Sequence, residues 1–275
     1  MTTLRFGTAG IPISTSKPTT LTGIEQVRKL GLGCMELEFV HSVNISEAKA
    51  PLVKEMAKKQ DVALTAHGQY FINLNAQERE KLEASKHRIL KAARIAELCG
   101  ASSMTFHAAY YMKQDSEKVY VRVKESVKEI VKNLKDNGFK IWIRPETTGK
   151  ATQWGDLKEI TKLSEEVEQV LPCIDFSHLH ARTGKNNTYD EFKEMLAYVE
   201  KKLGRLALNN MHIHLSGINY SEKGERNHLV LEESDMNYKD LLKVFKEFNI
   251  KGNVISESPN IEQDALLLKR FYHKA

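Results

Sequence analysis

The strongest constraint on the fold of this chain is a repeated alternation of short apolar runs with longer segments of helical periodicity. The short runs are rich in β-branched and aromatic residues, and most have glycine or proline in or near them, which is typical of buried parallel strands. Eight such runs occur, at residues 4–11, 34–40, 62–68, 103–109, 140–146, 171–178, 211–217 and 252–258. They predict eight parallel strands.

The segments between these runs are amphipathic. In residues 118–136, Val119, Val123 and Val127 share one helical face opposite lysines and glutamates, and Gly138 follows where a helix can end. Comparable helices are predicted over residues 22–30, 47–59, 78–98, 157–170, 189–203, 238–248 and 261–272. Eight strand–helix units in 275 residues predict an α/β fold, a closed (β/α)8 TIM barrel, with residues 1–275 forming a single domain.

The charge and cysteine content narrow the setting of such a barrel. The formal net charge of +5 permits a polyanionic partner, but a dedicated electrostatic nucleic-acid binder is usually more basic. Cys34, Cys99 and Cys173 are far apart and form no CxxC motif, so no disulfide framework is expected. Because we find no signal peptide and no apolar run near the roughly 20 residues that span a bilayer, we expect a cytoplasmic monomer without membrane contact.

Histidines and carboxylates gather at the carboxyl ends of the predicted strands. These ends converge on one mouth of a β/α barrel, where barrel active sites are built. A single histidine there is more often a hydrogen-bonded core residue, and a single aspartate can cap a helix. Crowded together, however, such groups would suffer desolvation and repulsion without a cation, and they are ligands that suit Zn²⁺, Mn²⁺ or Fe²⁺. The pattern predicts a metal site formed by His67, His107, Glu146, Asp175, His178, His214 and Glu257.

Two further positions in the predicted strands carry polar side chains whose partners stay open. Glu36 and Glu38 point the same way from residues 34–40. Either one of them faces the barrel interior and contacts the site, or a buried carboxylate pairs with Arg5 or another base. His212, two residues before His214 on the same strand face, is expected to be a deeper interior neighbour.

In their local sequence, the strand ends resemble the endonuclease IV family of abasic-site endonucleases. The resemblance runs in order over nearly the whole chain, and its most specific part is the Asp-x-x-His of residues 173–184. The matching stretches are AHGQYFINLN (66–75), TFHAAY (105–110), PETTGK (145–150), CIDFSHLHARTG (173–184), HIHLSG (212–217) and SESP (256–259). The resemblance implies a DNA-repair enzyme that hydrolyses double-stranded DNA on the 5′ side of abasic sites.

The resemblance also implies a cluster of zinc ions. One zinc would be held by His67 and His107 and would share Glu146 with a second, which Asp175, His214 and Glu257 complete; a third would be held by His178 and His228. At the third zinc the match breaks, because the family has an aspartate where this chain has Arg226. Either Glu225 or Glu222 substitutes, or the third metal is weak or absent. Manganese in place of zinc also stays open.

The resemblance assigns further roles at the mouth. Glu146 and Glu257 would be catalytic, because metals bridged by Glu146 lower the pKa of a bound water and Glu257 orients that nucleophile. Tyr70 matches an aromatic residue of the family that binds DNA, and Phe71 beside it would act as an apolar wedge. The stretch VHSVNIS after residues 34–40 contains no arginine, although the family has one there. The basic residues Arg182, Lys185 and Lys223 either meet phosphates or are ordinary solvated loop charges.

Two other functions compete with this interpretation. Sugar isomerases and epimerases on the same barrel resemble the chain at Glu146, Asp175, His214 and Glu257, which suffice for one divalent metal and acid–base chemistry; the fold does not choose between them. The additional ligands His67, His107 and His178 favour the phosphodiesterase. The change at Arg226 leaves room for a third function, a barrel that binds abasic DNA without cutting it.

Overall fold

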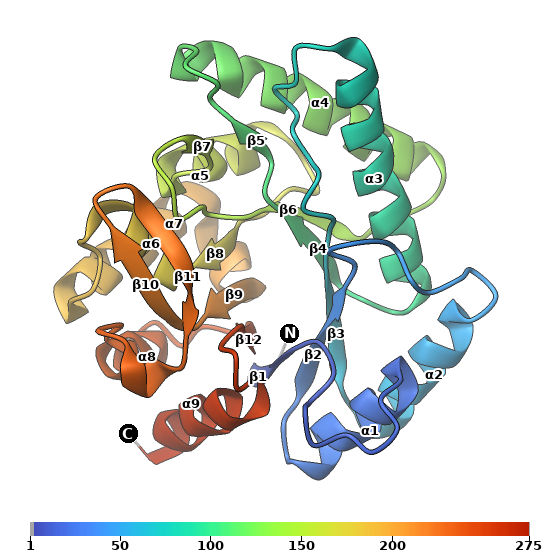
Figure 1. Ribbon diagram of the computed structural model, residues 1–275, viewed down its shortest axis with the longest axis vertical. Helices are drawn as coiled ribbons and strands as arrows, with labels where there is room; N and C mark the ends of the chain where they lie inside the picture. Colours follow the sequence, from blue (N-terminus) through green and yellow to red (C-terminus); the bar gives the residue numbers. More distant parts are fainter. Residues whose placement is uncertain (1–2, 275) are drawn as a thin grey trace.

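Eight parallel strands form one sheet in the computed structural model, which describes residues 3–274 (Figure 1). Their order is β6-β4-β3-β2-β1-β12-β9-β8, and parallel bridges between Ile143 and Val170 and between Glu146 and Cys173 join the two outer strands. The predicted (β/α)8 barrel is confirmed. The strands are β1 (Leu4–Ala9), β2 (Cys34–Glu38), β3 (Ala63–His67), β4 (Ser103–Phe106), β6 (Trp142–Pro145), β8 (Cys173–Asp175), β9 (Met211–Leu215) and β12 (Gly252–Ser256).

All eight predicted helices are present and surround the strands (Figure 1). Their ends follow local signals: Asp156 forms a reciprocal capping box with Glu159 at the start of α5, and Gly138 has a φ of +81° just beyond α4. The helices are α1 (Thr20–Lys29), α2 (Ala50–Gln60), α3 (Arg79–Leu98), α4 (Ser116–Asp136), α5 (Leu157–Glu166), α7 (Tyr189–Leu208), α8 (Tyr238–Glu247) and α9 (Glu262–Lys274). Within residues 3–274, none is long and apolar enough to cross a membrane.

Several short elements at the mouth were not predicted. The strand predicted at residues 171–178 is wrong in its second half, because the Asp175 side chain accepts a hydrogen bond from the His178 backbone and starts a helix there. His178 therefore lies on a helix rather than at the end of a strand. The added elements are α6 (Phe176–Thr183), the strand pair β5 (Ala109–Tyr110) and β7 (Gln153–Trp154), the hairpin β10 (Gly217–Ser221) and β11 (Gly224–Leu229), and the 3₁₀ turn η1 (Leu231–Glu233).

Substitution of two leucines of α7 would test how this helix packs on the barrel. Leu196 is fully buried and Leu206 is 60% exposed. We expect Leu196→Ala to lower the free energy of unfolding by about 2–5 kcal/mol, since it leaves a cavity, and the control Leu206→Ala to change it by less than about 0.5 kcal/mol. Urea denaturation followed by circular dichroism measures both. Equal losses would contradict the burial of this helix face.

Candidate metal centre

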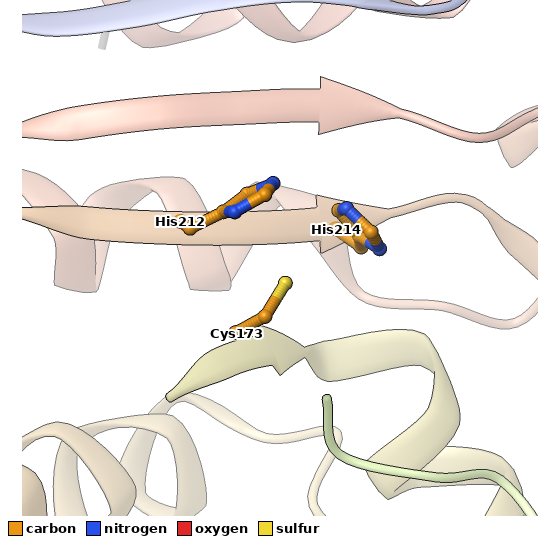
Figure 2. Close-up of side chains that lie close together, drawn as sticks. All are labelled: Cys173, His212 and His214. Atoms are coloured by element: carbon orange, nitrogen blue, oxygen red, sulfur yellow. The ribbon is translucent and has the colours of Figure 1, made fainter. Parts of the chain in front are cut away.

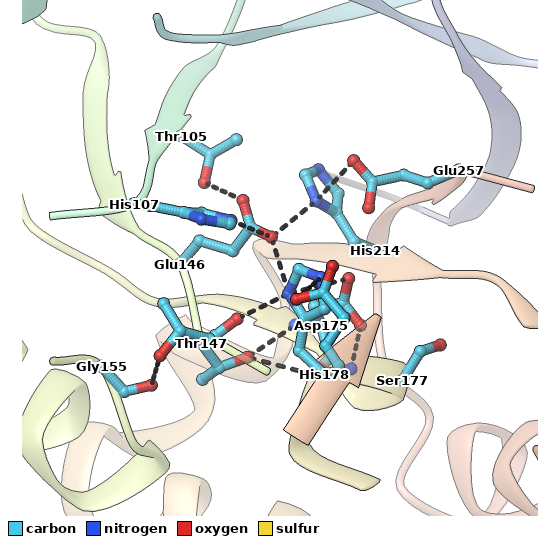
Figure 3. Close-up of polar contacts among 12 residues, drawn as sticks. Thr105, His107, Glu146, Thr147, Gly155, Asp175, Ser177, His178, His214 and Glu257 are labelled. Carbon is cyan, nitrogen blue, oxygen red and sulfur yellow. Dashed lines mark hydrogen bonds and ion pairs between the residues drawn. The ribbon is translucent and has the colours of Figure 1, made fainter. Parts of the chain in front are cut away.

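The buried carboxylate of Glu146 lies at the centre of the barrel mouth. It follows β6 directly, and four imidazoles from β3, the β4–β5 loop, α6 and β9 surround it. Figure 3 shows three of them, His107, His178 and His214, linked to this carboxylate. The closest nitrogen–oxygen distances are 3.2 Å for His67, 3.1 Å for His107, 3.2 Å for His178 and 3.4 Å for His214. One carboxylate thus organises side chains that are distant in sequence.

The structure brings all eight predicted ligands together in three adjoining groups. Within each group the donor atoms lie within 4.8 Å of one another. Glu146 is shared by the first two groups and Asp175 by the last two, so cations held by them would be neighbours. The groups are His67, His107 and Glu146; Glu146, Asp175, His214 and Glu257; and Asp175, His178 and His228.

The second group contains buried polar atoms with unused bonding capacity. Glu257 Oε2 has no hydrogen-bond partner among residues 3–274, whereas Glu146 Oε1, Asp175 Oδ2 and His214 Nδ1 contact only other histidines and carboxylates of the site, at 3.1–3.4 Å. Buried polar atoms are nearly always satisfied in proteins, and a cation among these closely spaced donors would also satisfy Glu257 Oε2. Carboxylate oxygen and imidazole nitrogen are donors that Zn²⁺ accepts. The residues present therefore suit a divalent cation.

Backbone carbonyls orient three of the imidazole rings. A backbone carbonyl only accepts hydrogen bonds, so a neutral ring whose Nδ1 contacts one carries its proton there and leaves a lone pair on Nε2. This arrangement holds for His67 at the Gly68 carbonyl (2.7 Å), His178 at the Thr147 carbonyl (3.0 Å) and His228 at the Glu257 carbonyl (3.2 Å). In their neutral forms, all three rings thus carry a lone pair on Nε2 that could bind a metal.

His214 is oriented by Glu36, which lies beneath the mouth on β2. One oxygen of Glu36 is 2.7 Å from His214 Nε2, and the other is 2.8 Å from His212 Nε2. The Nδ1 atom of His214 consequently faces Glu146 and Glu257. A carboxylate behind a histidine is the common outer layer of metal sites.

Figure 2 shows Cys173 on β8 facing His212 and His214, which extend from the same side of β9. Burial raises the pKa of the Cys173 thiol to about 12, and both imidazoles already contact Glu36. Ser103 Oγ also lies 3.1 Å from His212 Nδ1. We interpret these residues as a hydrogen-bonded layer below the mouth, which agrees with the deep position expected for His212.

The open question about the two glutamates of β2 is resolved by geometry. Glu36 faces the interior and its partners are histidines, whereas the Arg5 partner considered above is wrong. Arg5 instead pairs with Asp61 at 2.9 Å, because its side chain leaves the barrel on the outer side. Glu38 lies in register with His67, and burial raises its pKa to about 7. Nothing in the sequence marked the histidines as the partners of Glu36.

The rim of the mouth carries exposed apolar side chains. Tyr70 and Phe71 are 55% and 66% exposed, and the Tyr70 ring lies 5.9 Å from the ring of His67. Arg182, in contrast, donates to the Lys150 carbonyl and the Thr148 hydroxyl, so its charge is used to hold a loop. Lys185 and Lys223 are exposed.

The charged groups of the site predict how pH affects the metal-free protein. Burial opposes protonation of His67, but Glu146 outweighs it and raises the pKa of His67 to about 10, while burial raises the pKa of Glu257 to about 8. Both groups hold protons in the folded protein that the unfolded chain releases at lower pH. The stabilisation is therefore complete below the ordinary pKa values and is lost as pH rises.

We expect the free energy of unfolding of the metal-free protein to fall between about pH 4.5 and 10, because the folded state binds more protons there. Added zinc should reduce this fall, since its ligands must be deprotonated. Denaturant titrations at several pH values, with and without zinc, measure both effects. His67→Gln should show a shallower fall, and a flat profile in the parent protein would contradict the prediction.

The Glu36 contacts predict a second effect. Glu36→Gln keeps the size of the side chain but removes the charge that two imidazoles face. We expect a loss of about 3–5 kcal/mol in the free energy of unfolding without metal and a roughly 10–100-fold loss of zinc affinity. Denaturation and competition with a chromophoric chelator measure these quantities. The control is Glu25→Gln on the exposed side of α1, and equal behaviour of both variants would argue against the assigned role.

Comparisons with known proteins identify the family. The xylose isomerase-like TIM barrel family matches residues 24–271. An uncharacterized protein of Methanocaldococcus jannaschii is 46% identical over 272 residues, which cover 98% of this chain and 97% of that protein. Apurinic-apyrimidinic endonuclease 1 of Saccharomyces cerevisiae is 27% identical over 155 residues, which cover 52% of this chain and 41% of that protein.

Solved structures from two functional classes share the fold almost equally. Endonuclease IV from Thermus thermophilus has a TM-score of 0.75 at 18% identity, covering 98% of this chain and 100% of that one. A D-tagatose 3-epimerase-like protein has a TM-score of 0.74 at 17% identity, covering 98% and 96%. At these identities the likeness concerns the fold. Together with the match over residues 24–271, it shows that the chain belongs to the xylose isomerase-like TIM barrel family.

Proposed function

We propose that the protein is a zinc-dependent phosphodiesterase that cleaves double-stranded DNA 5′ to abasic sites, as a DNA-repair enzyme. The observation that carries this proposal is the layer of imidazoles added to the four-residue group around Glu146. His67, His107 and His178 contact the same carboxylate and extend the site beyond a single cation. The ordered resemblance to endonuclease IV and the yeast relative support it.

In this proposal, the ligands of each metal follow the three groups of side chains described above. His67, His107 and Glu146 would hold one zinc, Glu146 with Asp175, His214 and Glu257 would hold a second, and His178 and His228 would serve a third. Bound zinc supplies Lewis acidity for the phosphate and lowers the pKa of water at the site. Manganese is the alternative cation for this donor set.

Two carboxylates of this chain do the proton and positioning work. Glu146 holds the imidazoles of three elements at fixed separations, so that the reacting groups are oriented before substrate binds. Glu257 has a pKa raised by burial to about 8, and its Oε2 is free of protein hydrogen bonds within residues 3–274. In its ionised form, this carboxylate would accept a proton at Oε2 from the attacking water.

In the proposed function, residues on the exposed rim of the mouth bind the DNA. Tyr70 and Phe71 present aromatic surface beside the site, where they can stack on bases or wedge into a duplex. Lys185 and Lys223 extend into solvent and can meet phosphates. Arg182 has no such role, because it is bound to the loop at Thr148 and Lys150.

A sugar isomerase or epimerase is the second candidate. The near-equal TM-scores of 0.75 and 0.74 favour neither class, and the group of Glu146, Asp175, His214 and Glu257 alone would hold one cation. This candidate requires one metal and turnover of a ketose, without cleavage of DNA.

The deciding experiment incubates the protein with a duplex that contains one abasic analogue, with and without EDTA, and counts bound zinc. We expect nicking 5′ to the analogue that EDTA removes, and at least two zincs per chain. An undamaged duplex is the control substrate. One metal, no nicking and turnover of a ketose would overturn the proposal, and tight binding of the duplex without cleavage would indicate the non-catalytic function.

Glu146→Gln tests the bridging role in the same assay. We expect nicking to fall by at least about 10³-fold, since several kcal/mol of transition-state stabilisation depend on the metals and about 1.36 kcal/mol equals a factor of ten. Zinc content should fall as well, while Glu25→Gln keeps both. Full zinc content with unchanged nicking in Glu146→Gln would exclude the bridge.

A further inference from the structure

The β10–β11 hairpin contains one extra residue next to the site. Asn219 pairs with Asn227 but Tyr220 pairs with Glu225, so Arg226 is a β-bulge. In a regular strand, residues three apart point to opposite faces. The bulge instead turns Glu225 and His228 the same way, and their Oε1 and Nε2 atoms lie 3.9 Å apart.

Two glycines allow this hairpin, which lies beside α6 (Figure 1), to approach the β6–β7 loop. The Glu225 backbone donates to the Gly149 carbonyl at 2.9 Å. A Cβ on Gly149 would lie 2.6 Å from Glu225 Oε2, and a Cβ on Gly224 would run into the Gly149 carbonyl. The close approach places Glu225 Oε2 3.5 Å from His178 Nε2.

The facing imidazoles call for a positive charge between them. His178 and His228 bring their Nε2 atoms within 3.3 Å, although both rings already direct Nδ1 at backbone carbonyls. Their neutral forms would therefore oppose two lone pairs. Either a proton or a cation relieves this repulsion, and the adjacent carboxylate of Glu225 supplies the compensating charge.

The spacing of the three donors favours the cation. A tetrahedral ion with bonds of about 2.0–2.2 Å separates its ligands by about 3.3–3.6 Å. The observed separations are 3.3 Å between the two Nε2 atoms, 3.5 Å from His178 Nε2 to Glu225 Oε2 and 3.9 Å from His228 Nε2 to Glu225 Oε1. Two of these separations match that range, and the Glu225 carboxylate faces both imidazoles, with its Oε1 slightly farther from His228 than the range allows.

We propose that Glu225, carried into place by the Arg226 bulge, completes with His178 and His228 a three-ligand site for a zinc-like divalent cation. The inference rests on the proposed function, which places cations in this mouth, and it assigns the carboxylate that position 226 lacks. Three protein ligands leave one tetrahedral position for water or a phosphate oxygen of the substrate.

The test counts cations in the whole protein loaded with zinc and, separately, with ¹¹³Cd for NMR. We expect three per chain in the parent protein and two in Glu225→Gln, with the affinity of the lost ion down at least about 100-fold. Glu222→Gln, on the same hairpin, is the control and should keep three. The double variant Glu225→Gln/His228→Gln should still keep two, because both changes remove the same ion.

Each outcome bears on a different claim. Two cations in the parent protein would overturn the inference whatever the variants do, and would leave a proton shared by His178 and His228. Three cations in a folded Glu225→Gln would exclude this ligand. If the parent holds three cations but does not nick abasic DNA, the proposed function fails while this site stands. If the parent nicks abasic DNA but holds only two cations, the proposed function stands and this site fails.

Discussion

The position of Glu146 joins the closure of the barrel to the geometry of the site. Its backbone donates to the Phe106 carbonyl of β4 and forms the bridge to Cys173 that connects the two outer strands. Its side chain, on the same residue, is the buried carboxylate that four imidazoles face. A buried carboxylate without such partners would be strongly destabilising. The backbone of Glu146 thus helps to close the barrel, while the histidines around its side chain compensate the buried charge.

The side chains of the mouth form two layers. The charges of the lower layer are compensated within the protein, whereas the upper layer keeps polar groups for a ligand. Below it, Glu36 is matched by His212 and His214, so those charges are compensated within the protein. Above, Glu257 keeps an oxygen without a partner among the described residues, and burial raises the pKa of its carboxyl. Functional sites often retain such unfavourable groups because a ligand satisfies them. Cation binding to the folded state would then add directly to its stability.

Much of the barrel and its donor set could be predicted from the sequence, because buried parallel strands are short apolar runs and their ends meet at one mouth. The remainder depended on contacts between distant residues. Asp175 is the last residue of β8, and its side chain also caps α6. The position of Glu225 beside His178 and His228 depends on a bulge that only strand pairing reveals. The partner of Glu36 likewise lies on β9, far along the chain.

The barrel itself does not separate a phosphodiesterase from a sugar epimerase, as the TM-scores of 0.75 and 0.74 illustrate. The number of bound cations can separate these two functions. Phosphoryl transfer spreads negative charge over several oxygens and a leaving group, so additional cations lower its barrier. His67, His107, His178 and His228 add donors around the four-residue group instead of altering it. In the proposed phosphodiesterase, the additional histidines lie at the periphery of the mouth, and the central carboxylate of Glu146 is the same as in the four-residue group.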